Sequence, residues 1–435
     1  MSISREKIEV LKSILKELHR GASVEELKHK IRDALKEISP FEIPLIEHEL
    51  IKEGIPVSEI LKLCDLHVEL LRDLLRPGEL KDVPKGHPLD LLSRENEHVI
   101  RLAETLNVYV EALSRARPEE AVNHLRSISD IVAGLRRLRL HYRKIQMLIF
   151  PYLERRGVTA VPRVLWGKED QAIIKLRELS ILIERGLSSP GEYVKSIVEK
   201  AKEISKEISD LVFREESILF PSVWALFSEG EWAAIHETAR NIGYLMPVEV
   251  EWTPKAKPIL PYEVSDIITP EQLERLPQEF KSAALATLAP DTYKVESEGD
   301  IEFDTGFLSK NEVEAIFRHM PIEITYADAN NRVTFFSESV FRKGFVRTRT
   351  LIGRRFEYCH PPRLENFVKS VVNDLKSGKD DHREYWTRLG DRIIRVMVLA
   401  VRDKNGNYLG TLEMVEDLTE VVNNPEEIKK RIIIL

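Results

Sequence analysis

The sequence contains little cysteine and no long apolar run. Its 435 residues include only two cysteines, Cys64 and Cys359, which exclude a disulfide framework and favour a reducing compartment. The longest apolar stretches, Ile218 to Phe227 and Ile393 to Val401, are far shorter than the roughly 18 residues that a membrane helix needs. A charged amphipathic helix is predicted where a signal peptide would begin. We therefore expect a cytoplasmic protein without a membrane partner.

The sequence also has only a small excess of one charge sign over the other. Lys and Arg number 65 against 72 Asp and Glu, which gives a net charge of −7. Because such a balanced surface offers no net electrostatic attraction to a polyanion, we predict no nucleic-acid partner. The apolar fraction of 43% excludes a simply disordered chain. The length corresponds to about three domains.

Helical signals dominate the N-terminal half. Residues 1–80 have the pattern of a small helical domain, and Pro77-Gly78 marks its end. From 84 to 230, long apolar stripes with three interruptions predict a four-helix bundle. Phe150-Pro151 and Phe220-Pro221 lie at corresponding places near the ends of the second and fourth helices. This repetition indicates that one helix-pair motif is used twice.

The last part of the chain changes from helical to strand periodicity. Prolines recur through residues 245–305, which predicts a semi-rigid connector. Between 308 and 423, two strands, a helix opened by Pro361-Pro362, and three antiparallel strands with a turn at Asn405-Gly406 are expected. The expected fold class is thus a multidomain protein with an all-α N-terminal half followed by an α+β domain.

The middle segment resembles the hemerythrin-type HHE cation-binding domain. The matching phrases are His141-Tyr142-Arg143-Lys144, Phe150-Pro151-Tyr152-Leu153-Glu154, Trp166-Gly167-Lys168-Glu169-Asp170 and Glu215-Glu216-Ser217-Ile218-Leu219-Phe220-Pro221. The resemblance implies a bundle in which inward histidines and carboxylates hold two irons between the helices.

The two flanking segments resemble other families. The last one resembles a PAS sensor domain, through Ile324-Thr325-Tyr326-Ala327-Asp328, Gly353-Arg354-Arg355, Cys359-His360-Pro361-Pro362 and Asp417-Leu418-Thr419. The first is similar to an uncharacterised helical domain that commonly precedes those two modules in bacterial and archaeal proteins. The phrases that carry this match are Glu49-Leu50-Ile51-Lys52-Glu53-Gly54-Ile55-Pro56 and Leu63-Cys64-Asp65-Leu66-His67.

The hemerythrin resemblance implies a metal site built from His87, His141, Glu169 and Glu215. In the family pattern the second and fourth helices each carry a His and, four residues later, a Glu. This chain has His141 but Ile145 on the second helix, and Glu215 but Leu211 on the fourth. A complete two-iron centre is therefore not expected. The remaining set suits one iron, manganese or zinc ion.

The alternative is a bundle that has lost its metal. Ile145 and Leu211 would then fill the core of a degenerate site. A buried Glu215 would still need His141, an arginine or a metal to compensate its charge, because an unpaired carboxylate is costly to bury.

Two Cys-His pairs are further candidates. Cys64 and His67 lie three residues apart on an apolar helix stripe, which allows a second metal or redox site or, alternatively, ordinary core packing. Cys359 and His360 precede a helix start, where Cys359 is a candidate redox switch and His360 a candidate contact for a PAS ligand of unknown identity. Alternatively, the following prolines fix the helix entry and His360 caps or packs against it.

No nucleotide-binding loop or nucleophile elbow is visible in the sequence. We therefore favour a non-catalytic sensor that couples a metal-binding or degenerate bundle to a PAS domain and signals through a protein partner, as a homodimer. One alternative is a non-heme iron enzyme or iron-handling protein that acts on oxygen or nitrogen oxides. Another is a metal-free interaction scaffold.

Overall fold

The computed structural model describes residues 82–264, 290–339 and 345–433, together with positions 13, 17, 54 and 55. The chain divides into two compact units, Met1–Lys294 and Val295–Leu435, each of which is described by itself. The candidate pair Cys64 and His67, and nearly all of the predicted domain 1–80, lie outside the described residues.

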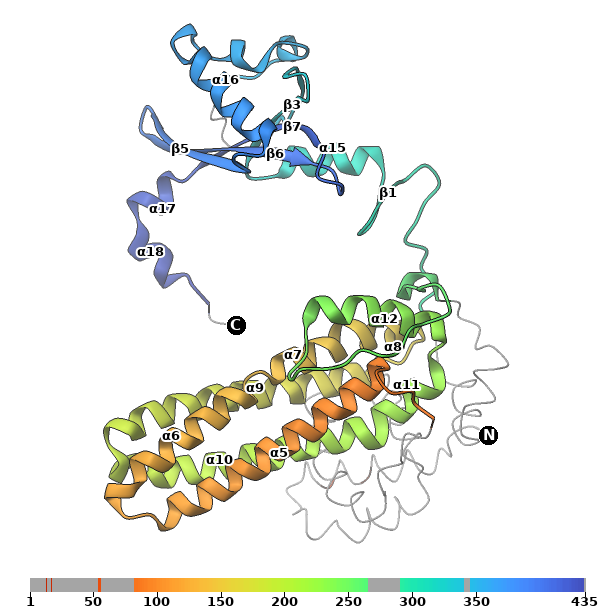
Figure 1. The fold of residues 1–435 in the computed structure, drawn as a ribbon, viewed down its shortest axis with the longest axis vertical. Helices are drawn as coiled ribbons and strands as arrows, with labels where there is room; N and C mark the ends of the chain where they lie inside the picture. Colours follow the sequence, from red (N-terminus) through yellow and green to blue (C-terminus); the bar gives the residue numbers. More distant parts are fainter. Residues whose placement is uncertain are drawn as a thin grey trace. The chain divides into compact units, whose positions relative to one another are not determined.

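The first unit contains a four-helix bundle (Figure 1). Its rods are α5 (Pro88–Arg115); α6 (Pro118–Leu135) continued by α7 (Leu138–Lys144), η1 (Ile145–Ile149) and α8 (Phe150–Arg155); α9 (Ala160–Ser188); and α10 (Pro190–Arg214) continued by η2 (Glu215–Leu219) and α11 (Phe220–Leu226). Helix α5 packs against α6 and α10, and α9 packs against the same two helices, so the rods form a closed ring. A further helix, α12 (Glu229–Ile242), packs against α5, α7 and η1 at one end of the bundle.

Two π-helical turns interrupt the second and fourth rods at corresponding places. The turn η1 directly precedes Phe150-Pro151, and η2 directly precedes Phe220-Pro221. In each turn the N–H of the phenylalanine reaches back five residues, from Phe150 to the carbonyl of Ile145 and from Phe220 to that of Glu215. A proline inside a helix removes one N–H and crowds the preceding turn, and a π-turn relieves that conflict. The sequence repeat therefore corresponds to a repeated structural feature.

The apolar stripes of the rods meet in one continuous core. Leu106 and Val110 of α5, Ile128 of α6, Leu176 of α9 and Ile208 of α10 are all fully buried in it. Each helix presents these side chains at the three- and four-residue spacing that places them on one face. Between residues 88 and 242, the described chain is thus mainly helical, as the sequence predicts.

The chain that leaves α12 lies on the surface of the bundle. Lys85 Nζ contacts Glu251 at 2.7 Å, and the Ile259 N–H donates to the Gly230 carbonyl at 2.9 Å. The Tyr152 hydroxyl donates to the Ile259 carbonyl at 2.7 Å. A short 3-10 turn, η3 (Pro261–Glu263), follows. We call residues 243–264 the strap, because backbone hydrogen bonds fasten them along the bundle.

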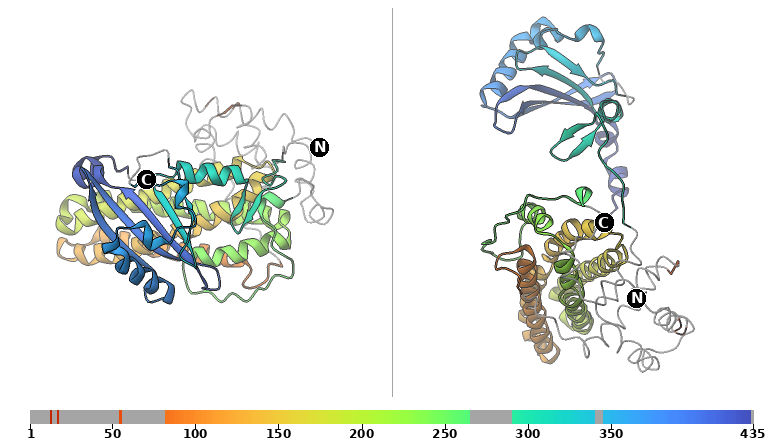
Figure 2. Two further views of the ribbon diagram at one scale, coloured as in Figure 1. Left: turned by 90° about the horizontal axis from the view of Figure 1, so that it is seen from above. Right: turned by 90° about the vertical axis from the view of Figure 1, so that its right-hand side faces the viewer.

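The second unit is built on a five-stranded antiparallel sheet of order β4-β3-β7-β6-β5 (Figure 2). Its strands are β3 (Glu323–Asp328), β4 (Val333–Phe336), β5 (His382–Leu389), β6 (Arg392–Arg402) and β7 (Tyr408–Asp417). Helix α16 (Pro362–Ser377) packs against β6 and β7. The order of two strands, a helix and three strands is the one predicted, and it confirms the α+β class of this unit.

Short elements surround the sheet. Before it come the hairpin β1 (Ile301–Phe303) and β2 (Gly306–Leu308) and the helix α15 (Lys310–His319). The turns η4 (Arg349–Leu351) and η5 (Phe356–Cys359) lead into α16, and α17 (Thr419–Asn423) and α18 (Pro425–Lys430) follow the last strand. Asn331 and Gly406 take positive φ at the turns after β3 and β6, which explains why those residue types stand there.

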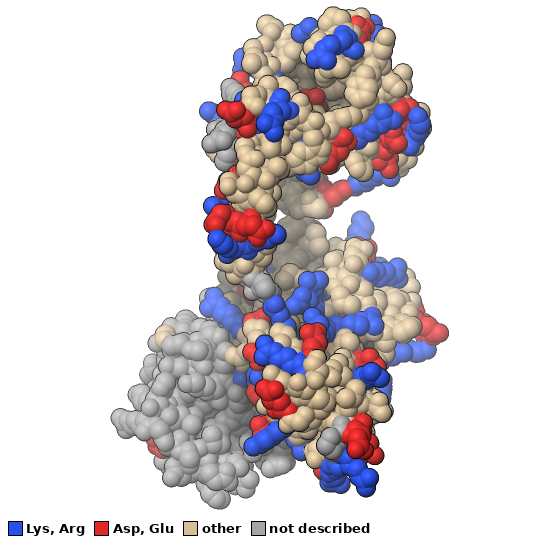
Figure 3. All heavy atoms as spheres, turned by 90° about the vertical axis from the view of Figure 1, so that its left-hand side faces the viewer, with Lys and Arg blue, Asp and Glu red and all other residues tan. Residues whose placement is uncertain are grey.

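The surface carries charges of both signs. On the face drawn in Figure 3, Lys and Arg are interspersed with Asp and Glu over both described units. In the parts of the chain that the structure describes, no helix combines the length and apolar character of a membrane span.

Candidate functional site: a buried charge network in the helical bundle

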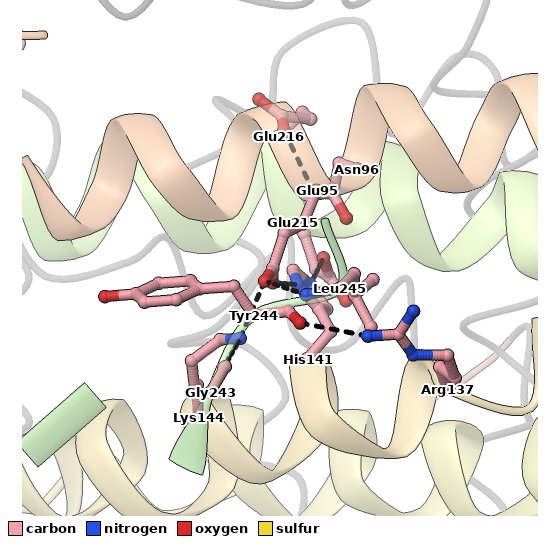
Figure 4. A network of polar contacts seen from close by, with 10 residues as sticks. All are labelled: Glu95, Asn96, Arg137, His141, Lys144, Glu215, Glu216, Gly243, Tyr244 and Leu245. Atoms are coloured by element: carbon pink, nitrogen blue, oxygen red, sulfur yellow. Dashed lines mark hydrogen bonds and ion pairs between the residues drawn. The ribbon is translucent and has the colours of Figure 1, made fainter. Parts of the chain in front are cut away.

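His141 of α7 is buried inside the bundle with a carboxylate on each side (Figure 4). Its Nδ1 is 2.7 Å from Glu95 Oε2 of α5, and its Nε2 is 2.9 Å from Glu215 Oε2 of η2. All three side chains are buried. Two carboxylate acceptors on one ring require both ring nitrogens to donate, which defines an imidazolium. Glu215 is therefore compensated by His141, one of the partners that its burial demanded.

The electrostatics agree with this protonation. Burial by itself lowers the pKa of His141, but Glu215 and Glu95 outweigh burial and raise that pKa to about 10. Burial raises the pKa of Glu95, and here His141 and Lys144 prevail and lower it. The cation and its two anions thus stabilise one another in an interior of low dielectric.

Lys144 extends this arrangement by one helical turn. Its Nζ donates to Glu95 Oε1 and to the carbonyl of Gly243, both at 2.7 Å. The N–H of Leu245 donates to the same Glu95 oxygen at 3.0 Å. Both oxygens of Glu95 are therefore engaged by three donors. We call Glu95, His141, Lys144 and Glu215 the buried network.

Glu169 lies beside the buried network on α9. Its Oε2 accepts from the Gln146 amide at 2.6 Å, whereas its Oε1 and Oε1 of Glu215 are both buried without a hydrogen-bond partner among the described residues. Burial, reinforced by the charge of Glu215, raises the pKa of Glu169 to about 8. The raised pKa favours the uncharged acid of Glu169, which would add no further negative charge beside the two cations and two anions of the buried network.

A second polar cluster flanks the network. Glu216 accepts from the Asn96 amide at 3.0 Å and from the Ser93 hydroxyl at 3.2 Å. Burial, with a further contribution from Glu215, raises the pKa of Glu216. Asn96 is thereby engaged in a side-chain hydrogen bond between α5 and η2.

His87 lies apart from the other three residues of the expected metal set. It is the N-cap of α5, where its Nδ1 accepts from the Leu89 N–H at 3.1 Å. The rings of Trp224, Trp232 and Trp252 surround it at centroid distances of 5.2, 4.7 and 4.6 Å. Burial in this aromatic cage lowers the pKa of His87 to about 3. Glu95 is eight residues further along α5, about 12 Å of helix rise.

The residues present do not fit a two-iron centre. Ile145 and Leu211, which stand where the family pattern has ligands, are buried in the apolar core. Glu95 is saturated by His141, Lys144 and a backbone N–H, and an ammonium group would repel a neighbouring metal cation. Among the residues that the structure describes, no three His, Cys, Asp or Glu side chains form a group that could hold a metal ion.

The PAS candidates lie together in the second unit. His360 Nδ1 donates to the Phe356 carbonyl at 3.1 Å, and the two rings pack edge to face at 5.5 Å. Cys359 Sγ is 3.5 Å from the Arg355 carbonyl, and burial raises the pKa of its thiol. Both residues line a cavity of about 530 Å³ beside α16.

Two residues of the buried network, Glu95 and Lys144, are not in the site predicted from the sequence. Glu95 lies on the apolar stripe of α5, three residues after Leu92 and four before Val99, and a carboxylate in such a stripe signals a buried partner. Lys144 follows His141 by three residues and so shares its face. Their partners are remote in sequence, so only the packed bundle shows the pairing.

The fold and this site define the class: a hemerythrin-like helical bundle joined to a PAS-like α+β domain. Comparison with family profiles places three families along the chain. A family of unknown function (DUF438) matches residues 11–77, the hemerythrin HHE cation-binding domain matches residues 87–223, and the PAS domain matches residues 313–419. These three family matches follow one another along the chain in that order.

Several solved structures are similar to parts of the chain. A C-terminal domain from Streptococcus mutans is 31% identical over 28% of this chain and 96% of its own, with a TM-score of 0.27. A PAS domain from Colwellia psychrerythraea is 17% identical over 25% of this chain and 97% of its own, with a TM-score of 0.21. A sensory box sensor histidine kinase from Vibrio cholerae is 8% identical over 25% of this chain and 90% of its own, with a TM-score of 0.19. No curated protein matches the chain.

Proposed function

We propose that the protein is a non-catalytic cytoplasmic sensor in which the helical bundle and the PAS domain are coupled through the strap, and that its output is a changed contact with a protein partner or within a homodimer. The observation that carries the proposal is the direct attachment of the strap to the buried network. The chain that leads toward the PAS domain begins in contact with two buried charged residues of the bundle, Lys144 and Glu95.

Three contacts make this attachment. Lys144 donates to the carbonyl of Gly243, and Glu95 accepts from the N–H of Leu245. Arg137 donates to the Tyr244 carbonyl at 3.3 Å (Figure 4). The first two contacts come from the network itself, so a change in the ion pair between Glu95 and Lys144 alters the anchoring of the strap. An element whose anchoring changes with the state of one site is what coupling between two sites requires.

The network also bears on the role of metal. The hemerythrin HHE family binds cations. In this chain His141 and Lys144 supply positive charge to Glu95 and Glu215. Both carboxylate oxygens of Glu95, which would have to bind a metal, already interact with these cations. We propose that protein cations take the structural place of a resident ion. The iron-enzyme alternative gains no support from this donor set, because it needs ligands that are free to coordinate.

The test removes the charge of Lys144 and follows both units of the full chain. Lys144→Met keeps an unbranched apolar side chain but removes the terminal ammonium, so Glu95 loses that partner. Amide hydrogen exchange at residues 243–252 should become about tenfold faster, since a buried ion pair contributes more than the roughly 1.4 kcal/mol that this factor represents. Coupling further predicts altered exchange in the sheet of the second unit.

Two further variants complete the test. Lys202→Met removes a surface partner of Glu111 at 3.3 Å and should leave both units unchanged. If Lys144→Met does not fold, Arg137→Gln loosens the strap at Tyr244 without disturbing a buried charge. If exchange rises in the strap while the sheet of the second unit stays as in the wild type, coupling is contradicted. The interpretation as a metal-free interaction scaffold would then remain.

A further inference from the structure

The cavity of the second unit has the dimensions of a small-molecule site. Its volume is about 530 Å³, within the range of roughly 300–1,000 Å³ usual for ligand pockets. Most of its wall is apolar and comes from η5, α16 and β6, including Phe356, Leu364, Val368, Val372 and Val398. A ligand here would bury an aromatic or aliphatic body against these side chains.

One end of the cavity is polar, and Arg347, the arginine of the wall that the structure describes, is already fully used. Arg347 donates from Nε to the Thr325 hydroxyl at 2.7 Å, from Nη1 to Glu323, and from Nη2 to Glu413 Oε1 at 3.1 Å. The guanidinium therefore faces two carboxylates of its own chain. It has no edge left for the bidentate capture of an incoming carboxylate or phosphate.

Two acceptors remain beside it. His360 Nδ1 is committed as a donor to the Phe356 carbonyl, so in the neutral imidazole Nε2 is an acceptor. This Nε2 lies 4.0 Å from Glu413 Oε2, too far for a direct hydrogen bond. Arg347, Glu323 and Glu413 together carry one net negative charge. At this polar end of the described wall, free acceptors and net negative charge thus remain where the donors of Arg347 are already used.

We infer that this cavity binds an organic amine whose ammonium group donates to Glu413 and His360 while its apolar body packs against α16 and the sheet. The inference rests on the proposed sensor function, to which it gives a class of input. An ammonium supplies several donors and one positive charge, which matches the surplus of acceptors. A carboxylate on the same body would meet Glu413 with like charge and be rejected.

The experiment compares three probes with one indole body and different heads: tryptamine, tryptophol and indole-3-propionate. Binding to the full chain is measured by calorimetry and by protein-observed NMR at pH 8. Tryptamine should bind at least about tenfold more tightly than indole-3-propionate, a difference of roughly 1.4 kcal/mol, with tryptophol between them. Glu413→Gln should abolish the preference for tryptamine, while its amide oxygen can still accept from Arg347.

The controls separate the site from the surface. Glu416 lies on the same strand, on the opposite face, where it accepts from Arg395 at 2.8 Å, so Glu416→Gln should keep the preference. Leu364→Trp fills the cavity and should weaken all three probes. Tighter binding of the propionate, no binding of tryptamine, or unchanged binding in Leu364→Trp would each overturn the inference. Because binding is measured directly, these outcomes are independent of the exchange experiment on the strap.

Discussion

At the scale of the residue, the bundle is marked by the burial of several ionised groups in one place. His141 forms ion pairs with two carboxylates, and Lys144 pairs with one of them and also donates to a backbone carbonyl. Such a network costs desolvation when it forms, and it is strongly destabilised when one partner is removed, because the remaining charge is then buried without compensation. Removal of His141 affects the network most, because this residue pairs with two buried carboxylates.

Replacement of His141 by leucine is therefore expected to lower the free energy of unfolding of the bundle by about 3–5 kcal/mol at pH 7. Urea unfolding followed by tryptophan fluorescence measures this change, since four of the five tryptophans belong to the first unit: Trp166 in α9, Trp224 in α11, Trp232 in α12 and Trp252 in the strap. Adding Glu215→Gln removes one uncompensated charge and should restore at least about 1 kcal/mol. Lys200→Met, which breaks a surface pair with Glu178, should cost less than about 1 kcal/mol.

The same variant carries a pH signature. The folded-state pKa of His141, about 10, lies above the unfolded value of about 6.5, so its stabilisation is complete below pH 6.5 and is lost as pH rises toward 10. The difference in unfolding free energy between wild type and His141→Leu should therefore shrink across that window. A difference that stays constant from pH 6.5 to pH 10 would mean that the ring is not charged in the fold.

At the scale of the element, the strap depends on close backbone approach to the bundle. A Cβ at Gly230 would lie 2.6 Å from Ile259 Cδ1 and 2.8 Å from the carbonyl oxygen of Lys257. Glycine is needed here because the strap runs directly over the first turn of α12, where Ile259 also donates to the Gly230 carbonyl. The Lys257 oxygen belongs to the backbone, so it cannot move aside by a change of side-chain rotamer.

Gly230→Ala should consequently displace the strap around Ile259 while leaving the rods intact. The expected result is faster amide exchange at residues 255–262 with little change in the interior of α5 and α10, measured by mass spectrometry. Gly191→Ala is the matched control, because a Cβ at that position near the start of α10 meets no atom within 4 Å. Equal exchange in the two variants would show that the strap is not seated on Gly230 in solution.

At the scale of the whole molecule, the question is whether the chain carries a resident ion. Fold likeness favours a cation, whereas the residues in place supply their own positive charges at the centre of the bundle. Since function is located in sites rather than in folds, the donor set decides the expectation.

Protein produced with iron and purified without oxygen should therefore contain far less than one equivalent of any transition metal. His141→Ala and Glu215→Ala should not change that content. Element analysis of the three proteins gives the answer. Near-stoichiometric metal that both variants lose would show that the network rearranges into a binding site, and the proposal of structural replacement by protein cations would be abandoned.

The sequence by itself determined the helical and α+β halves, because helix and strand periods, proline and glycine positions are local properties. It also indicated that Ile145 and Leu211 leave an incomplete ligand set and that Glu215 needs a compensating charge. Tertiary structure decided which side chains meet. Helical spacing fixes the face of a residue but not its partner across the bundle, so the pairing of Glu95 with His141 and Lys144 became visible only after packing. For the same reason His87, one of the expected ligands, proved to be a helix cap inside a tryptophan cage.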